Sequence, residues 1–240
     1  MINLLLDVDD TLYDQLKPFE DAYQMVFSHY DAPIDQLFIK SRYYSEEVFD
    51  LVNDGKMDQH EMHIYRMSKA FSFLGFKITK EEAQLFQSHY EQNQRKIEIA
   101  PEMRKLLNEA KSQGLTLGII TNGPTEHQSN KIKQLKLTDW VQKDNIFISD
   151  ELGIAKPNIE IFRVVEQKMG IDRENSYYIG DSYRNDVVGA KAAGWHAIWV
   201  NRRNHVIPTN TDYLPEYIID DQSSPMHVLR RILEKKSNEK

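Results

Sequence analysis

LLLDVDDTLYD, residues 4–14, carries three aspartates, Asp7, Asp9 and Asp10, directly behind a run of leucines. The leucines predict a buried strand, and the aspartates would then stand at its carboxyl end. Isolated buried carboxylates cost several kcal/mol each unless they are paired, protonated or bound to a metal. The stretch therefore predicts a strand end that needs a cation, which the rest of the chain must supply or bind.

Short apolar runs rich in β-forming residues recur along the chain and are typical of parallel strands buried on both faces. They cover residues 2–8, 115–121, 145–149, 176–181, 196–201 and 217–220. Helical segments alternate with the later runs, over residues 101–113, 124–136, 158–169, 184–193 and 225–235. This alternation predicts the α/β class, with a Rossmann-like doubly wound parallel sheet.

The connection between the first two predicted strands is the exception. A single crossover unit takes about 30 residues, whereas roughly a hundred residues lie here, far more than an ordinary loop. Two capping boxes, Asp58 to Glu61 and Thr79 to Glu82, open helices within it. We therefore expect an α/β core from residues 1–13 and 99–240, and an inserted α-helical subdomain from residues 14–98.

Composition limits the possible functions. The 240 residues include no cysteine, which excludes disulfides and thiolate chemistry and fits a reducing compartment, with the cytoplasm as the expected location. The net charge of −7 argues against a nucleic-acid partner, because that affinity depends on clustered Lys and Arg. The N-terminal apolar run is too short for a signal peptide or a membrane span, so no membrane partner is expected.

Polar residues follow several of the predicted strands at the point where each strand ends. Ligands of an open α/β sheet bind at the carboxyl ends of its strands. The residues at or near these ends are Asp7, Asp9, Thr121, Asn122, Gly123, Lys156, Gly180, Asp181, Ser182 and Asp186. A carboxylate among them could act as a nucleophile that is already ionised at neutral pH. Mg²⁺ and a lysine would neutralise its repulsion from a phosphate dianion, and an all-oxygen site favours Mg²⁺.

With these residues the chain resembles the haloacid dehalogenase superfamily, in its phosphatase branch with a helical cap. DVDDT (7–11) matches the first motif of that family, TNG (121–123) the second, KP (156–157) the third and GDSYRND (180–186) the fourth. Each motif alone is weak. All four stand in the family's order at strand ends, with an insertion at the position of the family's cap, and together they make a strong signal over nearly the whole chain.

The resemblance implies a role for each matching residue. Asp7 would be the nucleophile that forms an aspartyl-phosphate, and Asp9 the acid and base, which requires its pKa to be raised by its anionic neighbours. The implied metal ligands for Mg²⁺ are Asp7, the main-chain carbonyl of Asp9, and Asp181, with Asp186 as a further or alternative ligand. The implied substrate-binding residues are Thr121, Asn122, Gly123 and Lys156, Thr121 and Lys156 also being counted as catalytic.

The expected activity is Mg²⁺-dependent hydrolysis of a small phosphorylated metabolite by a monomer or homodimer. The stretches TNGPTEHQ and ISDELGIAKPNIEIF are similar to the branch that contains pyrimidine and related nucleoside 5′-monophosphate phosphatases. A sugar-phosphate phosphatase or a phosphosugar mutase would keep every motif, so both stay open. Asp9 argues against a dehalogenase, which needs no acid for its leaving group, and against a non-enzymatic phospho-aspartate module.

Overall fold

The computed structural model describes residues 1–238 of the chain, and it divides into two compact units. Met1–Asp14 and Glu98–Lys240 form one unit, called the α/β unit below, and Gln15–Ile97 form the other, called the helical unit. These bounds lie one residue from those expected from the sequence. Among the described residues, no helix combines the length and apolar character needed to cross a bilayer.

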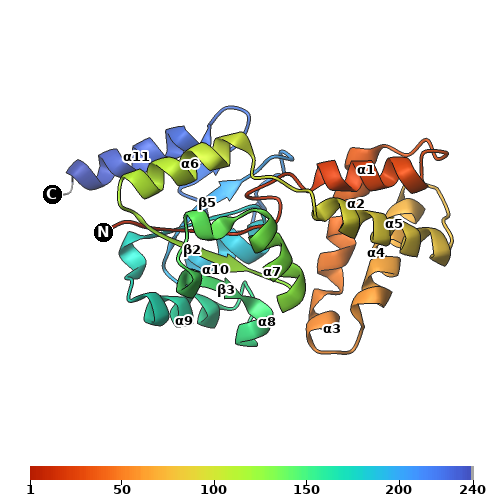
Figure 1. Ribbon diagram of the computed structural model, residues 1–240, viewed down its shortest axis with the longest axis horizontal. Helices are drawn as coiled ribbons and strands as arrows, with labels where there is room; N and C mark the ends of the chain where they lie inside the picture. Colours follow the sequence, from red (N-terminus) through yellow and green to blue (C-terminus); the bar gives the residue numbers. More distant parts are fainter. Residues whose placement is uncertain (239–240) are drawn as a thin grey trace. The chain divides into compact units, whose positions relative to one another are not determined.

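The α/β unit is built on one six-stranded parallel sheet (Figure 1). Its spatial order is β3-β2-β1-β4-β5-β6, and every neighbouring pair runs parallel. The strands are β1 Asn3–Leu6, β2 Thr116–Thr121, β3 Ile146–Ile148, β4 Ser176–Gly180, β5 His196–Val200 and β6 Tyr217–Ile219. All six predicted strands are present, and the order is that of a doubly wound Rossmann-like sheet, which confirms the predicted fold class.

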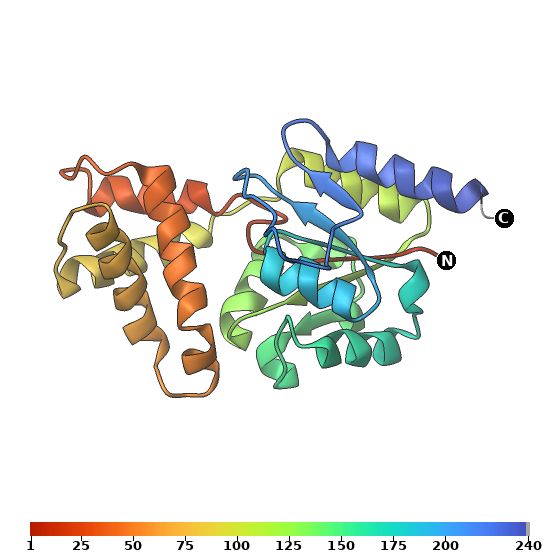
Figure 2. The same cartoon turned by 180° about the vertical axis from the view of Figure 1, so that it is seen from behind.

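Helices cover both faces of this sheet. α6 (Pro101–Ser112) and α11 (Pro225–Asn238) lie side by side on one face in both views (Figure 1 and Figure 2). α9 (Ile159–Met169) and α10 (Gly189–Ala192) pack on the other face, where Leu5, Ile120 and Tyr178 share a core cluster with their apolar side chains. Every residue of β1 is buried, as expected for a central strand covered on both faces.

The remaining elements of this unit are short, apart from α7 (Thr125–Gln134). They are α8 Ser149–Leu152, three 3₁₀ turns at Leu137–Asp139, Lys143–Asn145 and Arg173–Asn175, and a π-helical turn at Tyr183–Val188. The sequence predicted one helix over residues 184–193, so its first half differs from that prediction. The last helix extends three residues beyond its predicted end at Lys235, and residues 239 and 240 lie outside the described part.

The helical unit consists of α1 Leu16–Val26, α2 Ile34–Glu47, α3 Phe49–Asn53, α4 Gln59–Phe73 and α5 Lys80–Gln94. Both predicted capping boxes are formed, at the starts of α4 and α5. Its core is aromatic, with Phe19, Phe27, Phe71 and Phe86 buried together. This unit therefore has an apolar interior of its own, as an inserted subdomain requires.

Candidate active site

Three strand ends meet at the centre of the sheet. β1 lies between β2 and β4, and its last residue, Leu6, pairs with Ile119 on one side and Ile179 on the other. The Asp7 amide continues the ladder by donating to the Ile179 carbonyl (2.9 Å). The order of the strands reverses at this point, which is where open α/β sheets bind their ligands. Asp7 thus stands at the mouth of that crevice.

Lys156 is the cation beside Asp7. It lies in the loop between α8 and α9, only 2% exposed, and its Nζ donates to Asp7 Oδ1, Asp186 Oδ1 and Tyr178 Oη, each at 2.7 Å. Three partners use all three N–H groups of the ammonium. Burial opposes its charge, but Asp186 and Asp7 outweigh burial and hold the pKa of Lys156 well above its usual value. The lysine is therefore a fixed positive charge between two carboxylates.

Asp7, Asp181 and Asp186 form an acidic group in which one oxygen of each lies within 4.8 Å of the others. When all three are ionised, Lys156 offsets one of their charges, which leaves two negative charges in a largely buried place. Burial raises the pKa of Asp7 to about 7, and Asp186 and Asp9 add to the increase against the opposing pull of Lys156. This excess of oxygen-borne negative charge fits a divalent cation of the hard class.

Asp186 reaches this group because of two local features. It lies in the π-helical turn Tyr183–Val188, where its Oδ2 accepts from the Ser182 amide (2.9 Å). It also lies directly against Gly180, the last residue of β4, where an added Cβ would come within 2.3 Å of the Asp186 carboxyl. No side chain larger than hydrogen fits there without moving Asp186. Gly180 is therefore needed to place the third carboxylate.

Asp9 faces a different set of partners. Lys131 Nζ donates to both carboxylate oxygens, at 2.6 and 2.7 Å, Gln128 Nε2 donates to Oδ2 (2.9 Å), and the Tyr13 hydroxyl donates to Oδ1. Burial would raise the pKa of Asp9, but Lys131 and the hydrogen bonds from Tyr13 and Gln128 lower it far below its ordinary value. The sequence-based expectation of a raised pKa is therefore wrong, because the charge nearest to Asp9 is a lysine.

The second motif supplies an unpaired hydroxyl. Thr121 ends β2 with its side chain fully buried, and within residues 1–238 its Oγ1 has no hydrogen-bond partner. A buried polar atom without a partner is costly. A bound oxyanion would satisfy this hydroxyl, so its position suits the phosphate-binding role expected of Thr121.

Asn122 and Gly123 hold the site together in ways the sequence did not indicate. The Asn122 side chain clamps the Lys156 backbone, accepting from its amide (2.9 Å) and donating to its carbonyl (2.8 Å). The Gly123 amide, expected to face a phosphate, donates to Ser149 Oγ (3.0 Å) and so already has an acceptor. Gly123 has φ +138°, a conformation that favours glycine.

The structure thus brings Asp7, Lys156, Asp181 and Asp186 together, with Asp9 turned toward α7. Residues with a part in the site that were missed from the sequence include Tyr13, Gln128, Lys131, Ser149 and Tyr178. The spacing of Gln128 and Lys131, three apart on the helix after the second motif, puts both on one face and could have indicated them. Asp10, the third aspartate of the first motif, pairs with Arg203 (3.2 Å).

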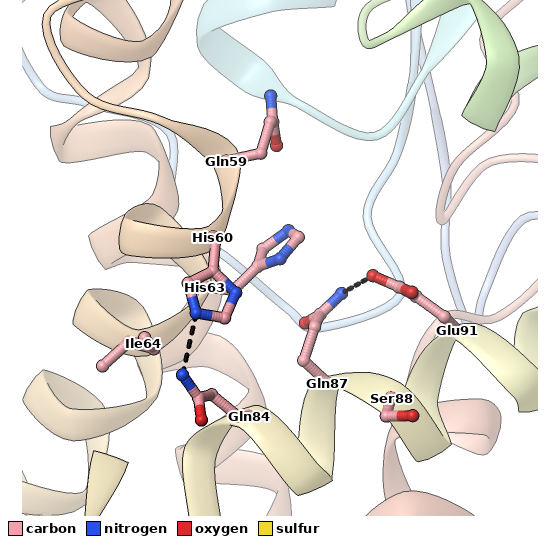
Figure 3. Close-up of a pocket in the computed structure, with 8 residues that line it drawn as sticks. All are labelled: Gln59, His60, His63, Ile64, Gln84, Gln87, Ser88 and Glu91. Atoms are coloured by element: carbon pink, nitrogen blue, oxygen red, sulfur yellow. Dashed lines mark hydrogen bonds between the residues drawn. The ribbon is translucent and has the colours of Figure 1, made fainter. Parts of the chain in front are cut away.

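The helical unit contains a pocket of its own, of about 370 Å³, between α4 and α5 (Figure 3). Imidazoles of His60 and His63 and the carboxamide of Gln84 line it, with Gln87 and Glu91 joined by a hydrogen bond of 2.8 Å. None of the site residues expected from the motifs lines this pocket. All of its lining residues belong to the helical unit.

A family model described as haloacid dehalogenase-like hydrolase matches residues 4–200. The chain therefore belongs to the haloacid dehalogenase-like hydrolases, which confirms the family recognised from its motifs. The crystal structure of a magnesium-bound HAD-hydrolase from Bacillus subtilis shares the fold, with a TM-score of 0.71 at 23% identity over 96% of this chain and 98% of that chain.

The relatives with named activities include two that differ in substrate. A glyceraldehyde 3-phosphate phosphatase of Methanothermobacter thermautotrophicus is 36% identical over 135 residues, which is 54% of this chain and 58% of the relative. The pyrimidine 5′-nucleotidase YjjG of Escherichia coli is 32% identical over 118 residues, 49% of each chain. The chain therefore matches only about half of the length of each of these relatives. Both relatives act on small phosphorylated molecules.

Proposed function

We propose that this protein is a phosphomonoester hydrolase that uses Mg²⁺ and forms an aspartyl-phosphate on Asp7. The observation that supports this most is the buried group at the end of β1, where a carboxylate nucleophile, a fixed lysine cation and two further carboxylates meet. A neutral substrate would not need so much buried charge. Relatives that act on phosphate esters point to the same chemistry.

The oxygen set of Asp7, Asp181 and Asp186 would hold the Mg²⁺ ion. When bound, that ion supplies positive charge which offsets the repulsion between Asp7 and a phosphate dianion and stabilises charge on the transferring phosphoryl group. The Lys156 ammonium supplies further positive charge for the same purpose, and it is present whether or not the metal is bound. The buried hydroxyl of Thr121 donates to a phosphate oxygen and thereby orients the phosphorus toward Asp7.

The reaction has two steps. Asp7 attacks phosphorus, the bond to the ester oxygen breaks, and the departing alkoxide takes a proton from Asp9. A water molecule then attacks the aspartyl-phosphate, Asp9 takes its proton, and inorganic phosphate leaves with Asp7 regenerated. Ionised Asp9, as held by Lys131, is the form that the second step requires. The proton that Asp9 takes from water in the second step leaves it protonated for the first step of the next turnover.

The direct test is release of phosphate from p-nitrophenyl phosphate by the purified protein, with Mg²⁺ or with excess chelator. We expect turnover only with the metal, and recovery when Mg²⁺ is added back after chelation. Turnover that is unchanged in excess chelator would contradict the metal-dependent mechanism. Failure to turn over any phosphomonoester in a broad panel with Mg²⁺ would contradict the activity itself.

We further propose that the preferred substrates are nucleoside 5′-monophosphates, with pyrimidine nucleotides first. The similarity to the pyrimidine 5′-nucleotidase supports this choice, whereas the similarity to a glyceraldehyde 3-phosphate phosphatase supports a sugar phosphate. The residues around Asp7 recognise only the phosphoryl group, so selectivity depends on other side chains. A competition assay with a panel of nucleotides and sugar phosphates decides between these two substrate classes. A sugar phosphate that exceeds every nucleotide tenfold in kcat/KM, about 1.4 kcal/mol in transition-state binding, would reject the nucleotide assignment alone.

A further inference from the structure

The buried side of α7 is polar, which is unusual for a helix of an α/β unit. The two buried residues of α7 are Gln128 and Lys131, and Lys131 is only 4% exposed. A lysine is almost never buried unless its ammonium is paired. Apolar residues at these two positions would hold the helix in place at lower cost. Their chemistry therefore calls for an explanation beyond packing.

Both side chains converge on Asp9. The Lys131 ammonium spans the two carboxylate oxygens, at 2.6 and 2.7 Å. Gln128 Nε2 donates to Asp9 Oδ2 and to the Asn122 carbonyl, both at 2.9 Å, and so ties Asp9 to the end of β2. With the Tyr13 hydroxyl on Oδ1, the carboxylate is held from three directions. Its rotation about the side-chain torsions is thereby restricted.

The backbone makes room for this arrangement. An added Cβ at Gly123 would come within 2.8 Å of Gln128 Nε2. The glycine of the second motif therefore allows Gln128 to reach between β2 and Asp9. Lys131 lies three residues further along the same helix face, directly behind Gln128. The turn after β2 and the buried face of α7 together form the binding site of the Asp9 carboxylate.

We infer that Lys131, supported by Gln128, is the positioning residue that orients Asp9 for proton transfer. This inference rests on the proposed phosphatase function, in which Asp9 is the group that exchanges a proton with the ester oxygen and with water. The contacts of the Lys131 ammonium with both Asp9 oxygens make its role one that acts through Asp9. Its effect on catalysis should therefore disappear when Asp9 can no longer transfer a proton.

A double-mutant cycle tests this dependence. Lys131→Met should lower kcat for an aliphatic phosphate ester by about 100-fold, the scale expected when a reacting group is misplaced by about 1 Å, with KM nearly unchanged. In the Asp9→Asn background, the same substitution should change kcat by no more than about threefold. Equal losses in both backgrounds would overturn the inference, because Lys131 would then act independently of Asp9.

The choice of substrate gives a second readout. p-Nitrophenolate leaves without a proton, so Lys131→Met should preserve the initial burst of p-nitrophenolate while slowing the steady state. A lysine that only stabilises the fold would reduce the burst and the steady state together, in parallel with a lower melting temperature. Lys133→Met, at an exposed position of the same helix, is the matched control and should leave both unchanged. If Lys131→Met does not fold, Lys131→Gln replaces it.

A crystal structure of the Lys131→Met protein separates this inference from the proposed function. We expect the Asp9 carboxylate to leave its observed position or to occupy more than one rotamer. An unmoved Asp9 would overturn the positioning role even if the enzyme were an active phosphatase. A displaced Asp9 in a protein whose wild type hydrolyses no phosphate ester would instead reject the proposed function and keep the structural role of Lys131.

Discussion

Asp7 and Asp9 stand two residues apart at the end of β1, yet they belong to two different regions of the site. The Asp7 region joins Lys156, Asp181 and Asp186. Burial, with smaller contributions from Asp186 and Asp9, raises the pKa of Asp7 to about 7 against the pull of Lys156. The Asp9 region joins Lys131, Gln128 and Tyr13, and although burial opposes it, their contacts lower the pKa of Asp9. Neighbouring identical residues thus acquire different chemistry from their partners.

Pairs of carboxyl groups whose surroundings push their pKa values apart commonly divide the work of a reaction. The Asp7 region is short of positive charge and suits a metal and a phosphate. In the Asp9 region, Lys131 already neutralises the charge of the Asp9 carboxylate, so this carboxylate needs neither a metal nor a phosphate beside it. This difference supports Asp7 as the group that bonds to phosphorus and Asp9 as the group that handles protons.

The largest expected effect comes from breaking the Asp7 region at its centre. Asp7→Asn removes the nucleophile and one metal-binding oxygen, and we expect steady-state turnover of p-nitrophenyl phosphate to fall by at least about 10⁴-fold. The variant should keep its circular dichroism spectrum, since Asn has nearly the same shape. Activity within tenfold of the wild type would show that Asp7 is not the nucleophile.

A smaller effect should follow from disturbing the Asp7 region without touching its charges. In Gly180→Ala the new methyl would lie within 2.3 Å of the Asp186 carboxyl, which must move. We expect Mg²⁺ affinity, measured by activity against metal concentration, to fall by about 10- to 100-fold, as for other changes that displace a ligand's support.

Gly75→Ala is a suitable control for this prediction. Gly75 differs from Gly180 in having a positive φ (+84°), and an added Cβ there meets nothing within 4 Å. It should lower stability through backbone strain and leave Mg²⁺ affinity unchanged. If Gly180→Ala binds Mg²⁺ as tightly as the wild type, the placement of Asp186 by Gly180 is not important for the metal site.

Glu216 is a carboxylate outside the candidate active site whose pKa, like that of Asp9, is lowered by its partners. Partial burial opposes its ionisation, but His196 Nδ1 (3.2 Å), the Lys191 ammonium and the Ala197 amide (2.6 Å) lower its pKa from 4.5 to about 2. Because the folded-state pKa is depressed, Glu216 stabilises the protein above the unfolded value, and this contribution is lost as the pH falls from about 4.5 toward 2.

Glu216→Gln should therefore lower the free energy of unfolding at neutral pH by a small amount. The gap between variant and wild type should narrow between about pH 5 and about pH 3, as measured by urea unfolding. Turnover at neutral pH should stay unchanged. A gap that is constant with pH would show that the ionised form of Glu216 is not what stabilises the fold.

The fold was predictable from the sequence because its strands are short apolar runs, and several of these runs are followed by polar residues. The same logic placed Asp7, Thr121 and Asp181 at one edge of the sheet. The surroundings of Asp9 were not predictable in this way. Lys131 and Gln128 lie more than a hundred residues from Asp9, and their contact depends on how α7 is rotated against the sheet.

The sign of the pKa shift at Asp9 shows the same limit. Counting nearby aspartates in the sequence predicts an increase in the pKa of Asp9. The position of Lys131, with hydrogen bonds from Tyr13 and Gln128, reverses it. The π-helical turn that carries Asp186 is a further example, because a six-residue local change within a predicted helix leaves no clear signal in residue type.

The central claim is that phosphorus bonds to Asp7 and that Asp9 only moves protons, and one measurement tests it directly. Wild type, Asp7→Asn and Asp9→Asn are mixed with p-nitrophenyl phosphate and Mg²⁺, quenched in acid within milliseconds, and mapped by peptide mass spectrometry. We predict phosphate on Asp7, accumulating most in Asp9→Asn because hydrolysis of the aspartyl-phosphate lacks its base, and none in Asp7→Asn. Phosphate on another residue, or its persistence in Asp7→Asn, would contradict the account.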